Sequence, residues 1–163
     1  MIKMLRLDER LIHGQITIKW SRHLGVDRMV VLNDEAANNE LIRKSLLMAA
    51  PGSVKTTIKG MDDGIALLND PRGAPFKMLA LAALPEEVLR ILQEVPGIQK
   101  VNVGNYGRVA PRQGTEHRKT YGANLYLYPN EVEILRQIIN TGVECVYQTT
   151  PEDPPTPLKD VIK

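Results

Sequence analysis

The residues best suited to chemistry lie close together near the N-terminus. His13 follows a short apolar segment and directly precedes Gly14, and Arg10 stands three residues before it. A free imidazole, with a pKa of about 6.5, is largely neutral at pH 7 and can act as a nucleophile. An arginine can donate two parallel N–H bonds to phosphate oxygens. The combination indicates a site that handles a phosphoryl group.

The segments on either side of His13 predict how it is positioned. Residues 2–7 form an apolar run typical of a strand, and residues 14–23 repeat apolar side chains at helical spacing. His13 is therefore expected just before the N-terminus of a helix, where unpaired N–H groups and a partial positive charge favour a phosphate. Gly14 has no Cβ, so the backbone can approach the phosphoryl oxygens closely.

Three further polar residues are candidates for the same site. Arg6, at the end of the strand, would add a second positive charge, and Asp8 would fix the loop by accepting from Arg10 or from loop N–H groups. Asp34 has two interpretations, which the sequence leaves open. Either it or Asn33 caps the second helix, or Asp34 faces the crevice and orients Arg10.

The rest of the chain alternates strand-like and helical segments. The expected strands cover residues 28–32, 54–58, 77–83, 100–103, 124–128 and 144–148, and the expected helices cover 35–49, 61–68, 85–94 and 130–141. This alternation favours right-handed βαβ units. We predict an α/β fold with a mostly parallel central sheet, helices on both faces and room for one antiparallel edge strand.

No linker or internal repeat interrupts the chain, so residues 1–163 are expected to form one domain. Residues 107–120 lack apolar periodicity and are expected to form a loop, and the proline-rich tail is expected to end in a short docked helix. Ligands of such sheets bind at the carboxyl ends of the strands. Those ends carry polar segments in this chain, at residues 8–15, 33–35 and 104–106.

Composition narrows the classes of function. The formal net charge is +2, and the basic residues are scattered, which argues against a nucleic-acid partner. The single cysteine, Cys145, excludes an internal disulfide and favours a reducing cytoplasm. No apolar stretch reaches the ~20 residues that span a bilayer, and the N-terminus lacks a signal-peptide pattern. We expect a cytoplasmic protein without a metal site, since no two histidines have metal-ligand spacing.

The segment from Arg6 to Gln15, followed by Trp20, resembles the active-site segment of a known family. This family comprises the IIB components of the mannose/fructose/sorbose type in the bacterial phosphoenolpyruvate-dependent sugar phosphotransferase system. The core Asp-x-Arg-x-x-His-Gly-Gln is specific. Nearly the whole chain is similar to the family, because further segments stand in the same order, at residues 33–35, 50–52, 102–105 and 142–145.

The resemblance implies a phosphohistidine carrier, a protein-phosphohistidine–sugar phosphotransferase that needs no cofactor. His13 would accept a phosphoryl group at Nδ1 from a phosphohistidine on the IIA protein or domain. It would then donate the group to a sugar bound by the membrane components IIC and IID, with which the protein would associate peripherally. The resemblance assigns Arg10 to the phosphate and Asp8, Gly14 and Gln15 to the shape of the loop, with Arg6 as a weaker match. Both a monomer and a homodimer are compatible with these partners.

Residues 106–121 depart from the family pattern, because they are richer in basic side chains. Positive charges there, such as Arg112, would steer an acidic partner toward the site, and His117 is a secondary candidate for approaching the incoming phosphate. Elsewhere, His23 is expected on the surface of the first helix and Cys145 in the core.

Two other functions remain open from the residues alone. One is a small hydrolase with His13 as general base, oriented by Asp34. It is weakened by the lack of a serine or cysteine in an elbow-like turn. The other is a regulator that binds a phosphate or nucleotide without transferring it.

Overall fold

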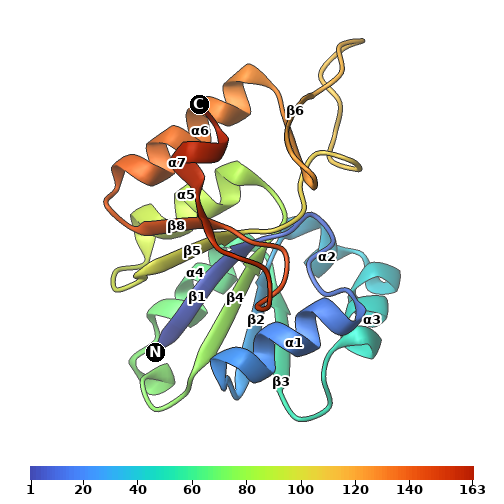
Figure 1. The fold of residues 1–163 in the computed structure, drawn as a ribbon. Helices are drawn as coiled ribbons and strands as arrows, with labels where there is room; N and C mark the ends of the chain where they lie inside the picture. The colour runs from blue at the N-terminus through green and yellow to red at the C-terminus, as the bar shows by residue number, and fades with distance from the viewer.

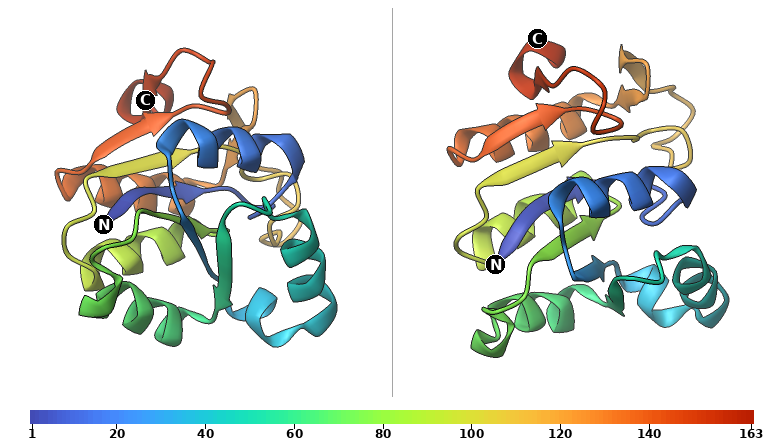
Figure 2. Two further views of the ribbon diagram at one scale, coloured as in Figure 1. Left: turned by 90° about the horizontal axis from the view of Figure 1, so that it is seen from below. Right: turned by 60° about the horizontal axis from the view of Figure 1, so that its bottom comes forward.

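The computed structural model describes residues 1–163 as a sheet with helices on both faces (Figures 1 and 2). The strand order is β3-β2-β4-β1-β5-β8-β9. All neighbours pair in parallel except β8 and β9, which are antiparallel. The strands are β1 (Ile2–Leu7), β2 (Arg28–Leu32), β3 (Lys55–Lys59), β4 (Met78–Ala82), β5 (Lys100–Val103), β8 (Glu144–Tyr147) and β9 (Thr156–Pro157). The predicted fold class is confirmed, including the antiparallel edge strand.

Successive side chains along the strands point to opposite faces of the sheet and pack into two separate hydrophobic cores. In β1, Leu5 packs into the larger core, whereas Met4 packs into the smaller core on the opposite face. The helices are α1 (Gly14–Leu24), α2 (Asp34–Asn38), α3 (Glu40–Ala49), α4 (Met61–Asn69), α5 (Pro85–Glu94), α6 (Pro129–Asn140) and α7 (Leu158–Val161). Helices α1 to α3 cover the smaller core, and α4 to α7 cover the larger one.

This arrangement places the end of β1 at the centre of the sheet. β1 lies between β4 and β5, and the chain leaves β1 through α1, on one face, and enters β5 through α5, on the other (Figure 2). In parallel sheets a ligand crevice forms where neighbouring connections leave on opposite faces. The loop that carries His13 begins at this position.

Two details differ from the sequence prediction. The expected helix over 35–49 is divided into α2 and α3, because Asn39 leaves the helical conformation and accepts a hydrogen bond from the N–H of Ile42 at 3.1 Å. The expected loop over 107–120 ends in a hairpin of β6 (Lys119–Gly122) and β7 (Leu125–Leu127). The predicted docking of the tail is confirmed, since Leu158 is fully buried.

The helices are all too short or too polar to cross a membrane.

Candidate functional site

The loop between β1 and α1 has an unusual backbone. Leu11 adopts a left-handed conformation with φ 61°, which costs about 1–2 kcal/mol for a residue with a Cβ. The side chains of Leu11 and Ile12 are buried beneath the loop and offset this cost. Gly14 is also left-handed, with φ 53°, and a Cβ there would meet no protein atom within 4 Å. Glycine is therefore favoured here by the left-handed turn into α1, and the space that a Cβ of residue 14 would enter is open.

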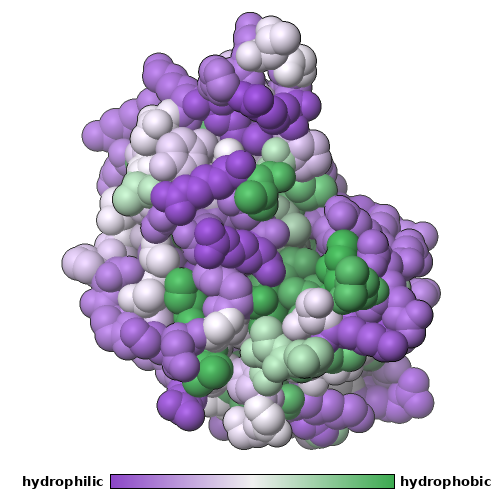
Figure 3. Space-filling model, turned by 90° about the vertical axis from the view of Figure 1, so that its right-hand side faces the viewer, coloured by the Kyte–Doolittle hydropathy of each residue, from purple (hydrophilic) through white to green (hydrophobic).

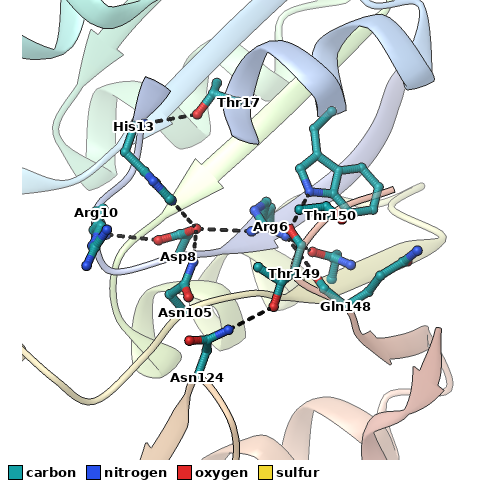
Figure 4. A network of polar contacts seen from close by, with 12 residues as sticks. Arg6, Asp8, Arg10, His13, Thr17, Asn105, Asn124, Gln148, Thr149 and Thr150 are labelled. Carbon is teal, nitrogen blue, oxygen red and sulfur yellow. Dashed lines mark hydrogen bonds and ion pairs between the residues drawn. The ribbon is translucent and has the colours of Figure 1, made fainter. Parts of the chain in front are cut away.

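His13 is held by a buried carboxylate (Figure 4). Its Nε2 lies 3.0 Å from Oδ2 of Asp8, whose side chain is 1% exposed. Burial alone would raise the pKa of Asp8, but the hydrogen bond to His13 and the charge of Arg6 outweigh burial and lower this pKa. An ionised carboxylate only accepts hydrogen bonds. Nε2 of His13 therefore carries the proton, and the lone pair of the neutral ring is on Nδ1.

Arg6 lies beneath the loop rather than beside the phosphate position. The residue is 2% exposed, and its guanidinium donates to Asp8 Oδ2 at 3.1 Å and to the carbonyl oxygens of Gln148 and Thr149, each at 3.1 Å. The expectation that Arg6 would add a second positive charge at the phosphate is therefore corrected. Its positive charge balances Asp8, and Asp8 in turn positions His13.

Residues in and just after β5 complete the support of Asp8 and of its partner Arg6. Asn105 donates from Nδ2 to Asp8 Oδ2 at 3.2 Å, and Asn102 accepts from Arg6. A Cβ on Gly104 would lie 2.1 Å from the Arg6 guanidinium, so only glycine lets the arginine pack there. The sequence assigned no role to Asn102 or Asn105 individually. Asn105 lies in the polar segment predicted at the end of a strand, at the same edge as His13, whereas Asn102 lies within the strand itself.

The start of α1 is open to an anion. His13 donates its own N–H to Oγ1 of Thr17 at 3.0 Å, but no side chain caps the helix, and the first turn holds no acidic residue. Arg10 donates its backbone N–H to Asp8 Oδ1 at 3.1 Å, whereas its exposed guanidinium forms no hydrogen bond or ion pair within the chain. Gln15 is exposed in the first turn. Arg10 and the helix start thus offer positive potential to a group on His13.

Asp34 does not belong to this cluster. Its Oδ1 accepts from the N–H of Met61 at 2.8 Å, at the start of α4, so the expectation that Asp34 orients Arg10 is wrong. Asn33 caps α2, accepting from Ala36 at 2.8 Å, which confirms one of the two interpretations for this segment. The hydrolase hypothesis used Asp34 to orient His13, but Asp8 takes that position.

The remaining candidates lie outside the cluster. His117 is exposed on the loop before β6, and its Nδ1 lies 2.5 Å from a nitrogen of Arg112. His23 is exposed on α1, as predicted. Cys145 is half-buried, and burial raises the pKa of its thiol to about 11, which fits an unreactive packing residue.

Comparison with known proteins identifies the family of this chain. Residues 2–163 match the family described as the sorbose subfamily IIB component of the phosphotransferase system. This match covers the loop, the supporting strands and the tail that contacts Arg6.

The chain belongs to this family.

Similar proteins agree with the assignment to the IIB components. A probable phosphotransferase enzyme IIB component of Streptococcus pyogenes serotype M6 is 34% identical over 86% of this chain and 85% of its own length. The IIB domain of the sorbose permease from Klebsiella pneumoniae has a TM-score of 0.89 and 28% identity, over 99% of this chain and 95% of that domain. The mannose-specific EIIAB component of Escherichia coli K12 is 29% identical over 99% of this chain, which spans 48% of that protein.

Membership in this IIB family gives the protein a general role in sugar phosphotransfer. The resemblance seen in the sequence is thereby confirmed.

Proposed function

We propose that this IIB component carries a phosphoryl group on Nδ1 of His13, between the phosphohistidine of a IIA protein and a sugar. The sugar would be held by the membrane components IIC and IID, which the protein would meet at the cytoplasmic face. The observation that carries the proposal is the 3.0 Å contact between Nε2 of His13 and the buried carboxylate of Asp8. It keeps one ring nitrogen protonated and leaves the other free to react.

The proposed first step is an in-line transfer between two histidines. The Nδ1 lone pair of His13 attacks the phosphorus, the new N–P bond forms, and the N–P bond to the donor histidine breaks. The donor nitrogen recovers the electron pair. In the second step a sugar hydroxyl oxygen attacks the same phosphorus, its proton passes to solvent or a base on the sugar-binding side, and His13 regains its lone pair.

Charge around the loop supports the intermediate. A phosphorylated histidine carries about two negative charges, and phosphoryl transfer depends mainly on positioning and charge stabilisation. The open N–H groups of α1, the unpaired guanidinium of Arg10 and the Cβ-free surface of Gly14 are available to the phosphoryl oxygens. Asp8 is also negative, but Arg6 balances it at 3.1 Å.

Labelling tests this proposal. The protein is incubated with radioactive phosphoenolpyruvate, the two general phosphotransferase proteins and a IIA partner. We expect a label that is labile in acid and stable in alkali, and no label on His13→Ala. His23→Ala, which changes an exposed histidine on α1, serves as the matched control and should label like the wild type. An unlabelled wild-type protein, or a fully labelled His13→Ala variant, would contradict the proposal.

A further inference from the structure

Glu9 lies next to Asp8 in the chain but binds a different segment. Its Oε1 accepts the backbone N–H groups of Gly107 at 3.0 Å and of Val109 and Ala110 at 3.1 Å each, and its Oε2 accepts the N–H of Arg108 at 3.1 Å. Four consecutive N–H groups thus converge on one carboxylate. Hydrogen bonds to an ionised acceptor are stronger than neutral ones, so this contact fixes the 107–110 turn.

The same turn is tied to the support of His13. The N–H of Glu9 donates to the carbonyl oxygen of Asn105 at 2.9 Å, and the Asn105 side chain donates to Asp8, which contacts His13. Asp8 and Glu9 therefore divide two tasks between neighbouring positions. Asp8 holds the reactive ring, and Glu9 holds the 107–110 turn.

The turn presents side chains suited to contact with another protein. Val109 is 71% exposed, and the guanidinium of Arg108 lies 5.5 Å from the centre of the Tyr126 ring. A hollow of about 380 Å³ borders the turn and is lined also by Arg112 and His117. The protruding upper part of the face seen in Figure 3 is largely hydrophilic. An exposed apolar side chain among cations suits an acidic partner surface with an apolar patch.

We propose that Glu9 is a positioning residue for partner recognition, which holds the 107–110 turn in register with His13. The inference rests on the proposed function, because it assumes that a phosphorylated protein docks at this loop. Without the Glu9 carboxylate, water would bind the four N–H groups and the turn would move. The contacts of His13 with Asp8, and of Asp8 with Arg6, do not include the Glu9 side chain. Recognition should therefore weaken, while the reactivity of His13 is kept.

Transfer kinetics with the phosphorylated IIA protein as substrate separate the two effects. We expect Glu9→Ala to raise KM for phosphorylated IIA about tenfold, equivalent to about 1.4 kcal/mol, and to change kcat less than twofold. Glu9→Gln keeps one oxygen for three of the N–H groups and should raise KM only about threefold. The matched control is Glu116→Ala, which removes the same charge from an exposed position on the nearby loop and should leave KM unchanged.

Two further measurements identify the cause. The phosphorylated Glu9→Ala protein should lose its phosphoryl group to water at the wild-type rate, and its Val109 and Ala110 amides should exchange hydrogen faster than those of the wild type. An unchanged KM in both Glu9 variants, or a fall in kcat at constant KM, would overturn the inference. A wild-type protein that accepts no label would instead overturn the proposed function, and this inference with it.

Discussion

The helix N-termini of this fold differ in the side chains that accept their backbone N–H groups. α5 and α6 each have a glutamate in the first turn that caps the N-terminus. Glu87 accepts the N–H of Leu84 at 3.0 Å, and Glu131 accepts the N–H of Tyr128 at 2.8 Å. Helices α3 and α4 also have acidic residues in their first turns. α1 has no acidic residue there, and the N–H of its N-cap residue, His13, is accepted by the neutral hydroxyl of Thr17 rather than by a carboxylate. Its N–H groups remain available to an anion from outside the chain.

The comparison separates stability from function. Glu131 closes α6 and also binds Arg118 and Tyr106, while Glu87 closes α5 and also binds Asn33. These contacts join distant segments and stabilise the fold. The start of α1 lacks such a carboxylate, whose interaction with the helix dipole is worth about 0.3–1 kcal/mol, and sites that sacrifice local stability are typically functional.

The largest expected effect comes from removing the carboxylate at the N-terminus of α6. Glu131→Ala removes the partner of Arg118, whose side chain is only 5% exposed, and leaves a buried charge unpaired. We expect the free energy of unfolding to fall by about 3–5 kcal/mol, measured by urea denaturation. Glu133→Ala, an exposed change on the same helix, is the matched control and should remain within 0.5 kcal/mol or so. Equal denaturation midpoints for the two variants would show that α6 does not depend on its internal carboxylate.

The buried carboxyl group of Glu87, at the N-terminus of α5, should make the free energy of unfolding depend on pH. Burial raises the pKa of Glu87 to about 7 from 4.5, against the opposing hydrogen bonds from Ala83, Leu84 and Asn33. Between these two values the folded protein holds a proton that the unfolded chain releases, so stability falls as the pH rises through this window. The loss amounts to about 3 kcal/mol.

Glu87→Gln should abolish this component of the pH dependence in denaturation curves between pH 4.5 and 8. Glu86→Gln, at the exposed neighbouring position, should retain it. A Glu87→Gln protein with the same pH slope as the wild type would refute the assignment.

The smallest expected effect comes from introducing a carboxylate at the N-terminus of α1. Gln15→Glu places a carboxylate in the first turn, as in the other helices, where it would compete with the phosphoryl group for the N–H groups. We expect the rate of labelling to fall about tenfold, equivalent to about 1.4 kcal/mol, while the helix gains about 0.3–1 kcal/mol. Gln137→Glu makes the same charge change on the exposed face of α6 and should leave the rate unchanged. A Gln15→Glu variant that is labelled at the wild-type rate would contradict the claim that the N–H groups at the N-terminus of α1 bind the phosphoryl group.

The fold was predictable because its signals are local. Apolar runs marked the strands, Pro85 and the acids after it marked the start of α5, and the alternation of elements indicated a parallel sheet. The break between α2 and α3 was missed, because the apolar pattern continues across Asn39 while its side chain caps a new helix.

The site was predictable only in part, for the same reason. The spacing of Arg10, His13 and Gly14 suggested a phosphate site, and Asp8 was expected to shape the loop. The contacts of Arg6 with Gln148 and Thr149 join residues more than 140 positions apart. No local pattern encodes such contacts, so Arg6 was expected at the phosphate rather than beneath Asp8.

The most direct test is nitrogen and phosphorus NMR of the phosphorylated protein with isotope-labelled histidine. The central claim is that the open start of α1 receives a phosphoryl group on the one ring nitrogen of His13 that Asp8 does not hold. We predict a phosphorus–nitrogen coupling to Nδ1 of His13, with Nε2 still protonated. Coupling to Nε2, or to any other residue, would contradict the account.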